Sequence, residues 1–499
     1  MELRAVLDGC SVVHTRGDLN ASISGITLDS RQVAPGFIFV AIRGFKADGN
    51  RFVPDAIARG ASAIVSAVSG DNYPTTAWIQ VSDEREALAS LAASFYGHPA
   101  RKLHAIGVTG TNGKTTTTYL IESVLKAAGF PSAVFGTIAY RGPGFDLVAD
   151  RTTPEAPELQ SLFARVVDGG WKYAVMEVSS HAIELKRVQG LHFEVAVFTN
   201  LTRDHLDLHG DMRSYFLAKK KLFTGLDGTL PRVMVLNADD PHFSELKAIA
   251  PSRVISYAVD GEADVRPVRY DALGSGKGTE AVFTSPLGEL CIQSGKLLGK
   301  PNLYNIGATI GASVGLGLSA DAISVGVRSM PGVPGRFEPV MAGQNFRVIV
   351  DFAHTDDALI RVLQSAREIT SGRVLVVFGC GGDRDRTKRP LMGEAAVRGS
   401  DFVVATSDNP RSEDPRAILS EVEVGLRRAG GIEGKNYRLV PDRREAIQYA
   451  LKLATAGDTV LLAGKGHESY QIIGSESLPF DDRAVARELL DELATQPNR

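Results

Sequence analysis

The stretch GVTGTNGKTTTT, residues 107–118, combines residue types that bind anions. Gly110 and Gly113 allow the backbone to approach an anion closely, because glycine has no Cβ atom in the way. The peptide N–H groups between them, including those of Thr111 and Asn112, then serve as donors. An apolar strand before the stretch and a helix after it would add the positive end of the helix dipole. Residues 107–118 therefore predict a loop that holds phosphate groups.

The residues after this loop favour a nucleotide as the source of the phosphates. Lys114 would reach the β- and γ-phosphates, and the hydroxyl of Thr115, followed by Thr116, would bind Mg²⁺. The strict pattern GxxxxGK[ST] requires glycine where this chain has Val108, so the loop is a shorter variant. The alternative is a glycine-rich turn that only joins a strand to a helix. The loop alone does not separate motors, GTPases, kinases and ligases.

A carboxylate and an imidazole follow two other predicted strands. Glu177 ends the strand YAVMEV, and His205 follows the strand EVAVFTN after a short turn. Together with Thr115 they are reasonable ligands for Mg²⁺ held against ATP, although each taken alone is more simply a surface residue. A zinc site at DHLDLH is disfavoured, because no cysteine or spaced histidine pair supports it. The helix predicted over residues 211–223 carries three consecutive lysines, and composition does not distinguish Lys219 from its neighbours.

Parallel sheets are predicted to position these residues. From HAIGVTG onward, apolar runs alternate with helical stretches, as at SAVFGTI, YAVMEVSS, EVAVFTN and RVMVLNA. This alternation is typical of a mostly parallel sheet with helices on both faces. Such sheets bind ligands beyond the carboxyl ends of their strands. The polar clusters SSH, NLTRDH, AHTDD, GGDRDR, SDNPR and GKGHE all follow strands, so we expect them at the site.

Two changes of pattern divide the chain of 499 residues into three expected α/β domains. Residues 1–102 contain short alternating strands and a helix at EREALASLAASFYG, and HPARKL forms a linker. Residues 103–333 form the central domain with the phosphate loop and a buried core helix in the uncharged run 303–320. A stretch rich in Pro and Gly at 330–340 precedes a smaller, Rossmann-like doubly wound domain over residues 334–499.

The composition is that of an ordinary globular protein, 44% hydrophobic and 23% charged, with a net charge of −3. No basic excess points to nucleic acid or to a membrane surface. The three cysteines lie far apart and form neither a metal-type pair nor a disulfide framework, which suits a reducing cytoplasm. The first residues show no basic segment leading into an apolar run, so no signal peptide is predicted. We expect a cytoplasmic monomer that acts on small molecules.

The motifs together resemble the Mur ligases, the ATP-dependent amide-bond enzymes of bacterial cell-wall synthesis. The matching pieces occur in the family's order and span nearly the whole chain: GVTGTNGKTTTT, EVSSHA, TNLTRDHLDLHGDM, AKKKLF, LNADDP, GKPNLYN, PGRFE, DFAHTDDAL and GCGGDRDRTKRPLMG. Two further pieces, SDNPRSEDP and GKGHE, narrow the resemblance to members that add diaminopimelate. The resemblance implies three domains that bind, in order, the UDP end of the precursor, ATP with the peptide end, and the incoming amino acid.

The resemblance also implies roles for single residues. It implies that CO₂ converts Lys219 to a carbamate, which would hold a second Mg²⁺ near the γ-phosphate. Ser30 lies at the family's uridine-binding position. The positions that hold the muramoyl-dipeptide are Thr152, Thr153, Ser179 and Arg187. The positions expected to contact ATP outside the loop are Asn302, Arg336, Asp351 and His354. Phe352 and Asp356 depart from the family's more usual Tyr and Pro.

The implied reaction transfers the γ-phosphoryl group of ATP to a carboxylate. The acceptor is the D-glutamate γ-carboxylate of UDP-N-acetylmuramoyl-L-alanyl-D-glutamate, the UDP-MurNAc-dipeptide. The neutral amine of meso-diaminopimelate then attacks the acyl phosphate, which has a good leaving group. Lys114, Arg336 and two Mg²⁺ ions would neutralise the phosphates, and domain closure would exclude water.

Residues 408–411, DNPR, are expected to select the amino acid. Arg411 presents a planar fork that grips a carboxylate, which diaminopimelate has at its far end and lysine lacks. Asn409 donates and accepts through its amide, and Pro410 steadies the turn. The alternative is an Asx-Pro turn with a solvated arginine. The rest of this site is expected at Arg384 for the other carboxylate, Glu468 for the distal ammonium, Asp408 and Gly464.

Rival functions share parts of this pattern. A folylpolyglutamate synthetase-like ligase would share the phosphate loop and the lysine, but it should lack the N-terminal uridine domain and DNPR. A lysine-adding relative is nearer, and Arg411 argues against it. A motor or GTPase switch would need a guanine-recognition NKxD element, which the chain lacks. A non-catalytic nucleotide-binding module would not explain the polar clusters at strand ends in two domains.

Overall fold

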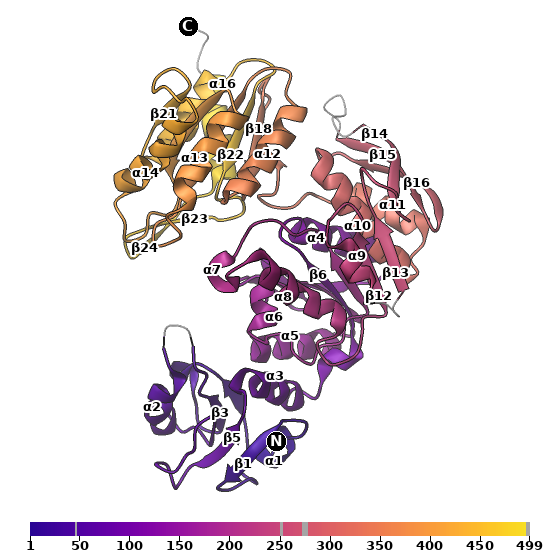
Figure 1. The fold of residues 1–499 in the computed structure, drawn as a ribbon, viewed down its shortest axis with the longest axis vertical. Helices are drawn as coiled ribbons and strands as arrows, with labels where there is room; N and C mark the ends of the chain where they lie inside the picture. Colours follow the sequence, from indigo (N-terminus) through magenta and orange to yellow (C-terminus); the bar gives the residue numbers. More distant parts are fainter. Residues whose placement is uncertain (45–46, 250–252, 272–277, 496–499) are drawn as a thin grey trace.

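The computed structural model describes residues 1–44, 47–249, 253–271 and 278–495. The chain forms three lobes that follow one another in sequence order along the long axis of the molecule (Figure 1). Each lobe is built on its own sheet. Within the described part of the chain, no helix combines the length and the apolar character that crossing a membrane requires.

The first lobe is a five-stranded sheet with the order β1-β5-β4-β3-β2. Its strands are β1 (Val12–Arg16), β2 (Gly25–Thr27), β3 (Phe37–Val40), β4 (Ala63–Ser66) and β5 (Ala77–Val81), and its helices are α1 (Leu3–Val6), α2 (Val53–Ala58) and α3 (Glu84–Phe95). All neighbouring strands except β1 and β5 run parallel. Strand β4 is buried on both faces, so the expected alternation is wrong there. The reason is that separate apolar clusters cover the two faces of this parallel sheet.

The second lobe contains an eight-stranded sheet with the order β13-β12-β11-β6-β10-β7-β8-β9. Its strands are β6 (His104–Thr109), β7 (Ser132–Phe135), β8 (Ala139–Gly142), β9 (Phe145–Val148), β10 (Tyr173–Glu177), β11 (Val195–Phe198), β12 (Val233–Asn237) and β13 (Arg253–Tyr257). Its helices are α4 (Lys114–Ala127), α5 (Ala156–Asp168), α6 (Ser180–Glu184), α7 (Leu206–His209), α8 (Met212–Thr224), α9 (Phe243–Lys247), α10 (Lys300–Leu316) and α11 (Ala320–Ser329). The parallel pairing of β6, β7 and β10 to β13 confirms the predicted sheet, and β8 and β9 extend it as an antiparallel hairpin.

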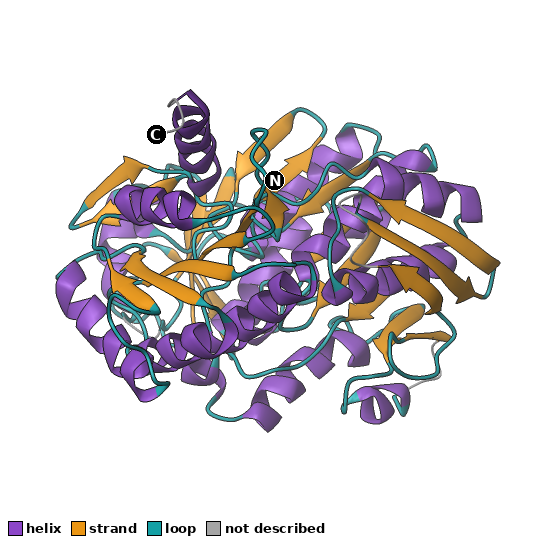
Figure 2. Ribbon diagram, turned by 90° about the horizontal axis from the view of Figure 1, so that it is seen from above, coloured by secondary structure: helices purple, strands orange, loops and turns teal. Residues whose placement is uncertain are grey.

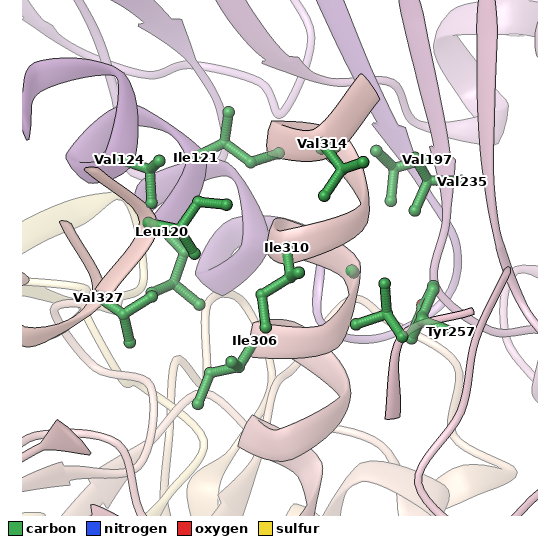
Figure 3. Close-up of a cluster of buried hydrophobic side chains, with 14 of the residues drawn as sticks. Leu120, Ile121, Val124, Val197, Val235, Tyr257, Ile306, Ile310, Val314 and Val327 are labelled. Carbon is green, nitrogen blue, oxygen red and sulfur yellow. The ribbon is translucent and has the colours of Figure 1, made fainter. Parts of the chain in front are cut away.

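Helix α10 forms the centre of the core on one face of this sheet. Its apolar side chains lie between those of α4 and those of strands β11 and β12 (Figure 3). The helix is buried almost all round, which confirms the core helix predicted in the run 303–320. The run is not one helix, because Gly317 ends α10 in a left-handed conformation and Ser319 caps α11.

A three-stranded antiparallel sheet packs against α11 and was not predicted. Its strands are β14 (Arg266–Asp271), β15 (Thr279–Ser285) and β16 (Gly288–Ser294). Buried and exposed residues alternate along β16, as expected for a sheet with one solvated face. That alternation is present in the sequence, so a search for period-two patterns would have found this sheet.

The third lobe has a six-stranded sheet with the order β17-β18-β22-β19-β20-β21. Its strands are β17 (Glu338–Pro339), β18 (Arg347–Asp351), β19 (Val374–Cys380), β20 (Phe402–Ser407), β21 (Tyr437–Leu439) and β22 (Thr459–Ala463). Its helices are α12 (Asp356–Glu368), α13 (Lys388–Gly399), α14 (Pro415–Arg428), α15 (Arg443–Leu453) and α16 (Asp482–Thr495), with a hairpin of β23 (Tyr470–Ile473) and β24 (Glu476–Pro479). Two apolar clusters on opposite faces confirm the doubly wound arrangement, and helices flank the strands in Figure 2.

Polar contacts join the lobes. Lys186 Nζ lies 2.9 Å from Asp83 Oδ2 and 2.6 Å from Glu86 Oε2, which ties the second lobe to α3 of the first. Thr202 Oγ1 donates to Asp357 Oδ2 at 2.8 Å, which ties the second lobe to the start of α12 in the third. The second and third lobes therefore meet at the polar strand-end cluster NLTRDH, next to the phosphate loop.

Candidate active site

The phosphate loop lies between β6 and α4, in the middle of the eight-stranded sheet. Gly110 has a φ of +146° and Gly113 a φ of +85°, conformations that favour glycine. A Cβ atom on Gly110 would lie 1.9 Å from Thr199 Oγ1, and one on Gly113 would lie 2.5 Å from Asn305 Oδ1. Both the backbone and the neighbouring side chains therefore require glycine. Helix α4 begins directly after the loop, so its first N–H groups face an anion held there.

The segment after β11 holds the loop in place. Thr111 N–H donates to Asn200 O at 2.8 Å, and Asn112 N–H donates to Asn200 Oδ1 at 3.0 Å. Thr199 Oγ1 donates to Asn112 O at 2.6 Å, and Thr202 N–H donates to Thr111 Oγ1 at 3.0 Å. The sequence predicted this segment only as a polar cluster near the site. Strand β11 comes five strands after β6 along the chain but pairs with β6 in the sheet, which places the segment after β11 next to the loop.

Two lysines from different helices converge on one carbonyl oxygen of the loop. Lys114 Nζ donates to Gly110 O at 2.9 Å and to Thr111 O at 2.8 Å, and Lys219 Nζ donates to Gly110 O at 3.0 Å. The ring of Tyr215 faces Lys219, with Nζ 4.5 Å from the ring centre. Burial lowers the pKa of Lys219 well below its usual value, and the charge of Lys114 lowers it further. Both effects favour the neutral form of the Lys219 amine.

Lys219 points to a different side of helix α8 from the two lysines that follow it in the sequence. Lys219 is 2% exposed, whereas Lys220 and Lys221 lie on the outer side of the helix. Lys220 donates to Glu245 at 2.8 Å and Lys221 donates to Glu184 at 2.6 Å. The orientation of α8 against the sheet therefore selects one lysine of three for the site, a choice that composition does not make.

Glu177 lies at the end of β10, which pairs with β6, the strand before the loop. Its carboxylate is 1% exposed and accepts hydrogen bonds from the Thr137 N–H at 2.9 Å and the Thr137 hydroxyl at 3.0 Å. Burial lowers the pKa of Lys114, and the charge of Glu177 opposes that effect. Glu177 is therefore within electrostatic reach of the phosphate-loop lysine.

His205 begins helix α7 with a φ of +53°. Its side chain is 42% exposed, its Nε2 lies 3.4 Å from Asp204 Oδ2, and its ring centre lies 4.6 Å from that of His181. Partial burial lowers the pKa of His205 to about 4, with the charge of Asp204 opposing and those of Lys114 and Lys219 adding to the decrease. The imidazole is neutral at pH 7, the form that binds metals. Asp204 was not predicted, although it stands in the quoted motif TRDH.

The donor set here suits a hard cation. A carboxylate at Glu177, a hydroxyl at Thr115 in the first turn of α4 and a neutral imidazole at His205 are ligands that Mg²⁺ accepts beside phosphate oxygens and water. Across the described ranges of the chain, no three His, Cys, Asp or Glu residues gather into a metal centre. These side chains therefore suit an ion that arrives with a nucleotide, which completes its coordination.

The third lobe contributes a cationic group at the loop. The guanidinium carbon of Arg336 lies 4.7 Å from the centre of the Phe352 ring, and its buried Nε has no hydrogen-bond partner among the described residues. Burial lowers the pKa of Lys114, and the charge of Arg336 makes a further, smaller contribution to that decrease. Asp351 accepts two backbone N–H bonds, at 2.7 and 2.9 Å. His354 Nδ1 lies 2.9 Å from Phe352 O.

The two departures from the family's usual pattern have physical explanations. Asp356 occupies the first position of α12, where proline is well tolerated and a negative charge is stabilised by the helix dipole. Phe352 retains the aromatic face that Arg336 packs against, so the missing hydroxyl leaves that contact intact. Asp357, beside Asp356, accepts the bond from Thr202 that joins the two lobes.

The four residues expected at the peptide end of the precursor lie together beside Glu177. Thr153 Oγ1 donates to Glu177 O at 2.8 Å and accepts from the Ser179 N–H at 3.2 Å. Arg187 Nη1 donates to Thr153 O at 3.2 Å. Thr152 Oγ1 lies 3.2 Å from a threonine hydroxyl that also donates to Glu177. The structure therefore brings this group next to the proposed metal ligand.

Two expected ligand contacts, Asn302 and Ser30, lie in different lobes. Asn302 Oδ1, at the start of α10, accepts from Asn305 Nδ2 at 3.0 Å, and Asn305 Oδ1 accepts from Thr117 Oγ1 at 3.4 Å. These bonds connect Asn302 to the first turn of α4. Ser30 begins a turn of 3-10 helix after β2, capped by Asp29, and belongs to the first lobe.

The motifs DNPR and GKGHE meet at the ends of β20 and β22. Asn409 Nδ2 donates to Glu468 Oε2 at 2.9 Å. Gly464 has a φ of +116°, and a Cβ atom there would lie 3.9 Å from Asp408 Cγ. Lys465, which was not among the predicted site residues, is fully buried between these segments. Burial raises the pKa of the Glu468 carboxyl, and the charge of Asp408 raises it further.

Arg411 is held so that part of its guanidinium stays available. Its Nη1 donates to Gly382 O at 2.8 Å, while Nε and Nη2 have no hydrogen-bond partner among the described residues. Its backbone, with a φ of +53°, follows Pro410 and pairs with the hairpin β23–β24. Arg384 lies exposed in the neighbouring loop. Within the described residues, Arg411 makes no hydrogen bond or ion pair to the second lobe, so the structure does not join it to Lys114.

Fold and site define an α/β enzyme of the phosphate-loop class, in which a third lobe reaches the nucleotide site. Models of three protein families match successive stretches: "Mur ligase family, catalytic domain" at residues 22–96, "Mur ligase middle domain" at 108–313 and "Mur ligase, glutamate ligase domain" at 335–466. The chain belongs to the Mur ligase family, as its motifs predicted.

Similar proteins match along almost the whole chain. The chain is 49% identical over 468 residues to a UDP-N-acetylmuramoyl-L-alanyl-D-glutamate–2,6-diaminopimelate ligase of Solibacter usitatus (strain Ellin6076), covering 94% of this chain and 93% of that protein. It is 46% identical to a protein of the same name from Geobacter metallireducens (strain ATCC 53774 / DSM 7210 / GS-15), covering 96% of each. A solved structure of that name superposes with a TM-score of 0.70 at 33% identity, covering 99% of this chain and 100% of that one.

Proposed function

We propose that the protein adds meso-diaminopimelate to the D-glutamate γ-carboxylate of UDP-N-acetylmuramoyl-L-alanyl-D-glutamate, with ATP converted to ADP and phosphate. The observation that carries this proposal is the convergence of Lys114 and Lys219, from two helices, on Gly110 O of the phosphate loop. Thr202, which is bonded to Thr111 of that loop, also joins the third lobe there through Asp357. The likeness along nearly the full length of relatives that are named for this reaction supports the choice of substrates.

In the first step, the transfer of the γ-phosphoryl group, different residues neutralise charge and position the substrates. Lys114 and Arg336 balance the negative charge that spreads over the transferred phosphoryl group, which needs positioning more than covalent help. Thr152, Thr153, Ser179 and Arg187 orient the peptide end, so that an oxygen of the D-glutamate γ-carboxylate attacks the γ-phosphorus while the bond to ADP breaks. We assign the UDP end to residues 1–102 through Ser30, and the adenine to Asn302, in the central domain of residues 103–333. Mg²⁺ bound by Thr115, Glu177 and His205 would supply further positive charge for the phosphates.

Lys219 is proposed to act as a carbamate. The Lys219 ammonium first loses one proton to solvent. The neutral amine then attacks CO₂, a C–N bond forms and a second proton leaves, so that a carboxylate-like anion replaces a buried cation. This exchange removes the repulsion between Lys219 and Lys114, whose ammonium groups share Gly110 O. The new carboxylate is a suitable ligand for a second Mg²⁺.

The second step takes place at the third lobe, residues 334–499. The neutral amine of the amino acid attacks the acyl carbon, a C–N bond forms, and phosphate leaves with the C–O electron pair. Arg411, through Nε and Nη2, binds the distal carboxylate, and Glu468 binds the distal ammonium. Arg411 is half-buried, so leaving its free N–H groups without the carboxylate is costly and lysine is a poor substitute for diaminopimelate.

A substrate panel tests this proposal. The protein is incubated with ATP, Mg²⁺ and UDP-MurNAc-dipeptide, together with diaminopimelate, lysine, ornithine or, with a folate acceptor, glutamate. We expect phosphate and ADP to be released with diaminopimelate. Release with lysine alone would identify a lysine-adding ligase, the second candidate. Formation of AMP in place of ADP would exclude the acyl-phosphate route.

Replacing Gly110 with alanine is expected to lower kcat/KM for ATP by about 10²-fold. The added Cβ atom would lie 1.9 Å from Thr199 Oγ1 and push the loop aside, and a misplacement of ~1 Å at a reacting group costs about that factor. Phosphate release at varied ATP measures the effect. Gly129→Ala is the matched control, because Gly129 also has a positive φ, near the other end of α4, but a Cβ there meets nothing within 4 Å. Equal activity of the two variants would contradict the role given to the loop.

A further inference from the structure

One buried lysine connects the segments that are proposed to bind the amino acid. The side chain of Lys465 is 0% exposed. Its Nζ donates to Asn409 Oδ1 at 2.9 Å and to Tyr470 O at 2.7 Å. The same Nζ lies 3.5 Å from Asp408 Oδ1 and 3.8 Å from Glu468 Oε2. A single ammonium therefore links the DNPR turn, the GKGHE turn and the hairpin β23–β24.

The amide of Asn409 links Lys465 to Glu468. Its Oδ1 accepts from Lys465 and also from the Ile472 N–H at 3.0 Å, which fixes the orientation of the amide. With Oδ1 so fixed, Nδ2 points at Glu468 and donates to Oε2 at 2.9 Å. Without the Lys465 ammonium, Asn409 Oδ1 would lose one of the two hydrogen bonds that fix the oxygen, and not the nitrogen, of the amide at this position. The position of the Glu468 carboxylate thus depends on Lys465 both directly and through Asn409.

The charges in this cluster do not balance. Asp408 and Glu468 supply two carboxylates, and Lys465 supplies one cation. The nearest further pair, Arg443 and Asp482, is fully buried, joined at 2.6 Å and neutral as a unit. Asp408 Oδ1 is buried and has no hydrogen-bond partner among the described residues. Arg411 is a further cation that acts on Glu468, where its charge opposes the increase in the pKa of that carboxyl. In the proposed site Arg411 pairs with the distal carboxylate of the substrate, so Asp408, Glu468 and Lys465 are left one cation short, and an incoming ammonium group would complete the cluster.

We propose that Lys465 is a specificity-determining positioning residue, which holds Asn409 and Glu468 so that one uncompensated carboxylate charge faces the distal ammonium of the amino acid. This inference rests on the proposed function, since it concerns the same site. Lys465 is buried and does not touch the reacting atoms. Lys465 fixes the positions of the Asn409 amide and the Glu468 carboxylate, and it limits the surplus negative charge to one unit. The site then attracts the distal ammonium of the amino acid without repelling its distal carboxylate.

Lys465 should affect the binding of diaminopimelate and of lysine differently. With Lys465 in place, a second carboxylate on the substrate is tolerated next to Asp408 and Glu468 because the site carries only one excess charge. With Lys465 removed, the surplus grows to two charges, which repels the distal carboxylate of diaminopimelate and attracts the ammonium of lysine. Loss of Lys465 should therefore weaken diaminopimelate and narrow the gap between diaminopimelate and lysine.

Lys465→Met, similar in length and neutral, tests this in the full-length enzyme. We expect KM for diaminopimelate to rise about 30-fold, the effect of losing a hydrogen bond to a charged group. KM for ATP and for the UDP-dipeptide should change less than about threefold, and the ratio of kcat/KM for diaminopimelate to that for lysine should fall by about tenfold or more. Steady-state phosphate release measures all four quantities. An equal rise in every KM, or an unchanged selectivity ratio, would overturn the proposal.

Two further variants keep the test decisive. Arg373→Met is the control, because Arg373 forms an ion pair with Asp458, at 2.7 Å, just before β19 and β22 begin. This pair lies at the ends of the strands that face away from the amino-acid site. We expect the kinetic constants of this variant to equal those of the unaltered enzyme. If Lys465→Met fails to fold, Lys465→Arg tests the proposal instead. Arginine retains the positive charge, but its longer planar guanidinium displaces Asn409. We expect a selective rise in KM for diaminopimelate, and no rise would refute the role of Lys465.

The same assays separate this inference from the proposed function. If the unaltered enzyme uses lysine in place of diaminopimelate, the proposed function is wrong. The role of Lys465 is then judged on the amino acid that the enzyme does accept. A selective rise in that KM alone would still support Lys465 as a positioning residue, and a uniform change would refute it.

Discussion

Replacing Lys219 with alanine is expected to lower kcat by about 10²–10³-fold, the size of effect seen when one group that stabilises a transferring charge is removed. Lys219 is buried against the phosphate loop, and its Nζ lies 3.0 Å from Gly110 O. As a carbamate it would supply an oxygen ligand for Mg²⁺, and alanine supplies none. Phosphate release at saturating ATP, UDP-dipeptide and diaminopimelate measures the loss.

The neighbouring lysines provide controls on the same helix. Lys220→Ala and Lys221→Ala each remove a surface ion pair, with Glu245 or Glu184, and should change kcat by no more than about twofold because such pairs contribute little. Carbon-13-labelled bicarbonate should give a carbamate signal in the NMR spectrum of the unaltered protein and of both controls. That signal should be missing from Lys219→Ala. A carbamate signal that persists in Lys219→Ala would contradict the assignment.

Replacing Arg411 with alanine should raise KM for diaminopimelate by about 10²-fold, the upper range for a hydrogen bond between charged groups. Its Nη1 is anchored on Gly382 O, which leaves Nε and Nη2 to form two parallel bonds to a carboxylate. KM for ATP should stay the same within about twofold, because Arg411 makes no polar contact with the second lobe among the described residues. Selectivity over lysine should fall by the same factor, since lysine lacks the distal carboxylate.

Two other arginine variants sharpen the result. Arg411→Lys keeps the positive charge but loses the fork, and we expect an intermediate rise in KM of about tenfold. Arg427→Ala, which removes an exposed arginine paired with Glu423 on α14, should have no effect on any KM. Calorimetric titration of diaminopimelate and of a non-hydrolysable ATP analogue would separate the two sites. An equal loss of affinity for both ligands would show that Arg411 supports the lobe and does not bind the amino acid.

Features that depend on neighbours along the chain could be predicted from the sequence. The phosphate loop follows from Gly110, Gly113 and Lys114, because its positive φ angles and the helix start are local properties. The parallel sheets of the second and third lobes follow from runs of apolar residues, since strands buried on both faces need no polar alternation. The run 303–320 predicted a core helix for the same reason, but the prediction missed that Gly317 ends the helix within the run.

Features that depend on how elements pack could not be predicted in this way. Three adjacent lysines have the same local environment in the sequence. Only the rotation of α8 against the sheet buries Lys219, leaves Lys220 half-buried and exposes Lys221. Lys465 lies in a quoted motif, but its role comes from Asn409, which is 56 residues away. The two residues meet beyond the ends of β22 and β20, which β19 separates in the sheet. The contact between Thr202 and Asp357 spans 155 residues.

The sequence by itself determined the class of chemistry, the phosphate loop and the order of the lobes, because each is written in short-range patterns of size, charge and apolarity. The tertiary structure decided which of several equivalent side chains enters the site, which polar segment clamps the loop, and which charges are left unbalanced around the amino-acid site. The physical reason is that burial, hydrogen bonding and electrostatic interaction depend on distance in space, and parallel sheets bring strand ends together that lie far apart along the chain.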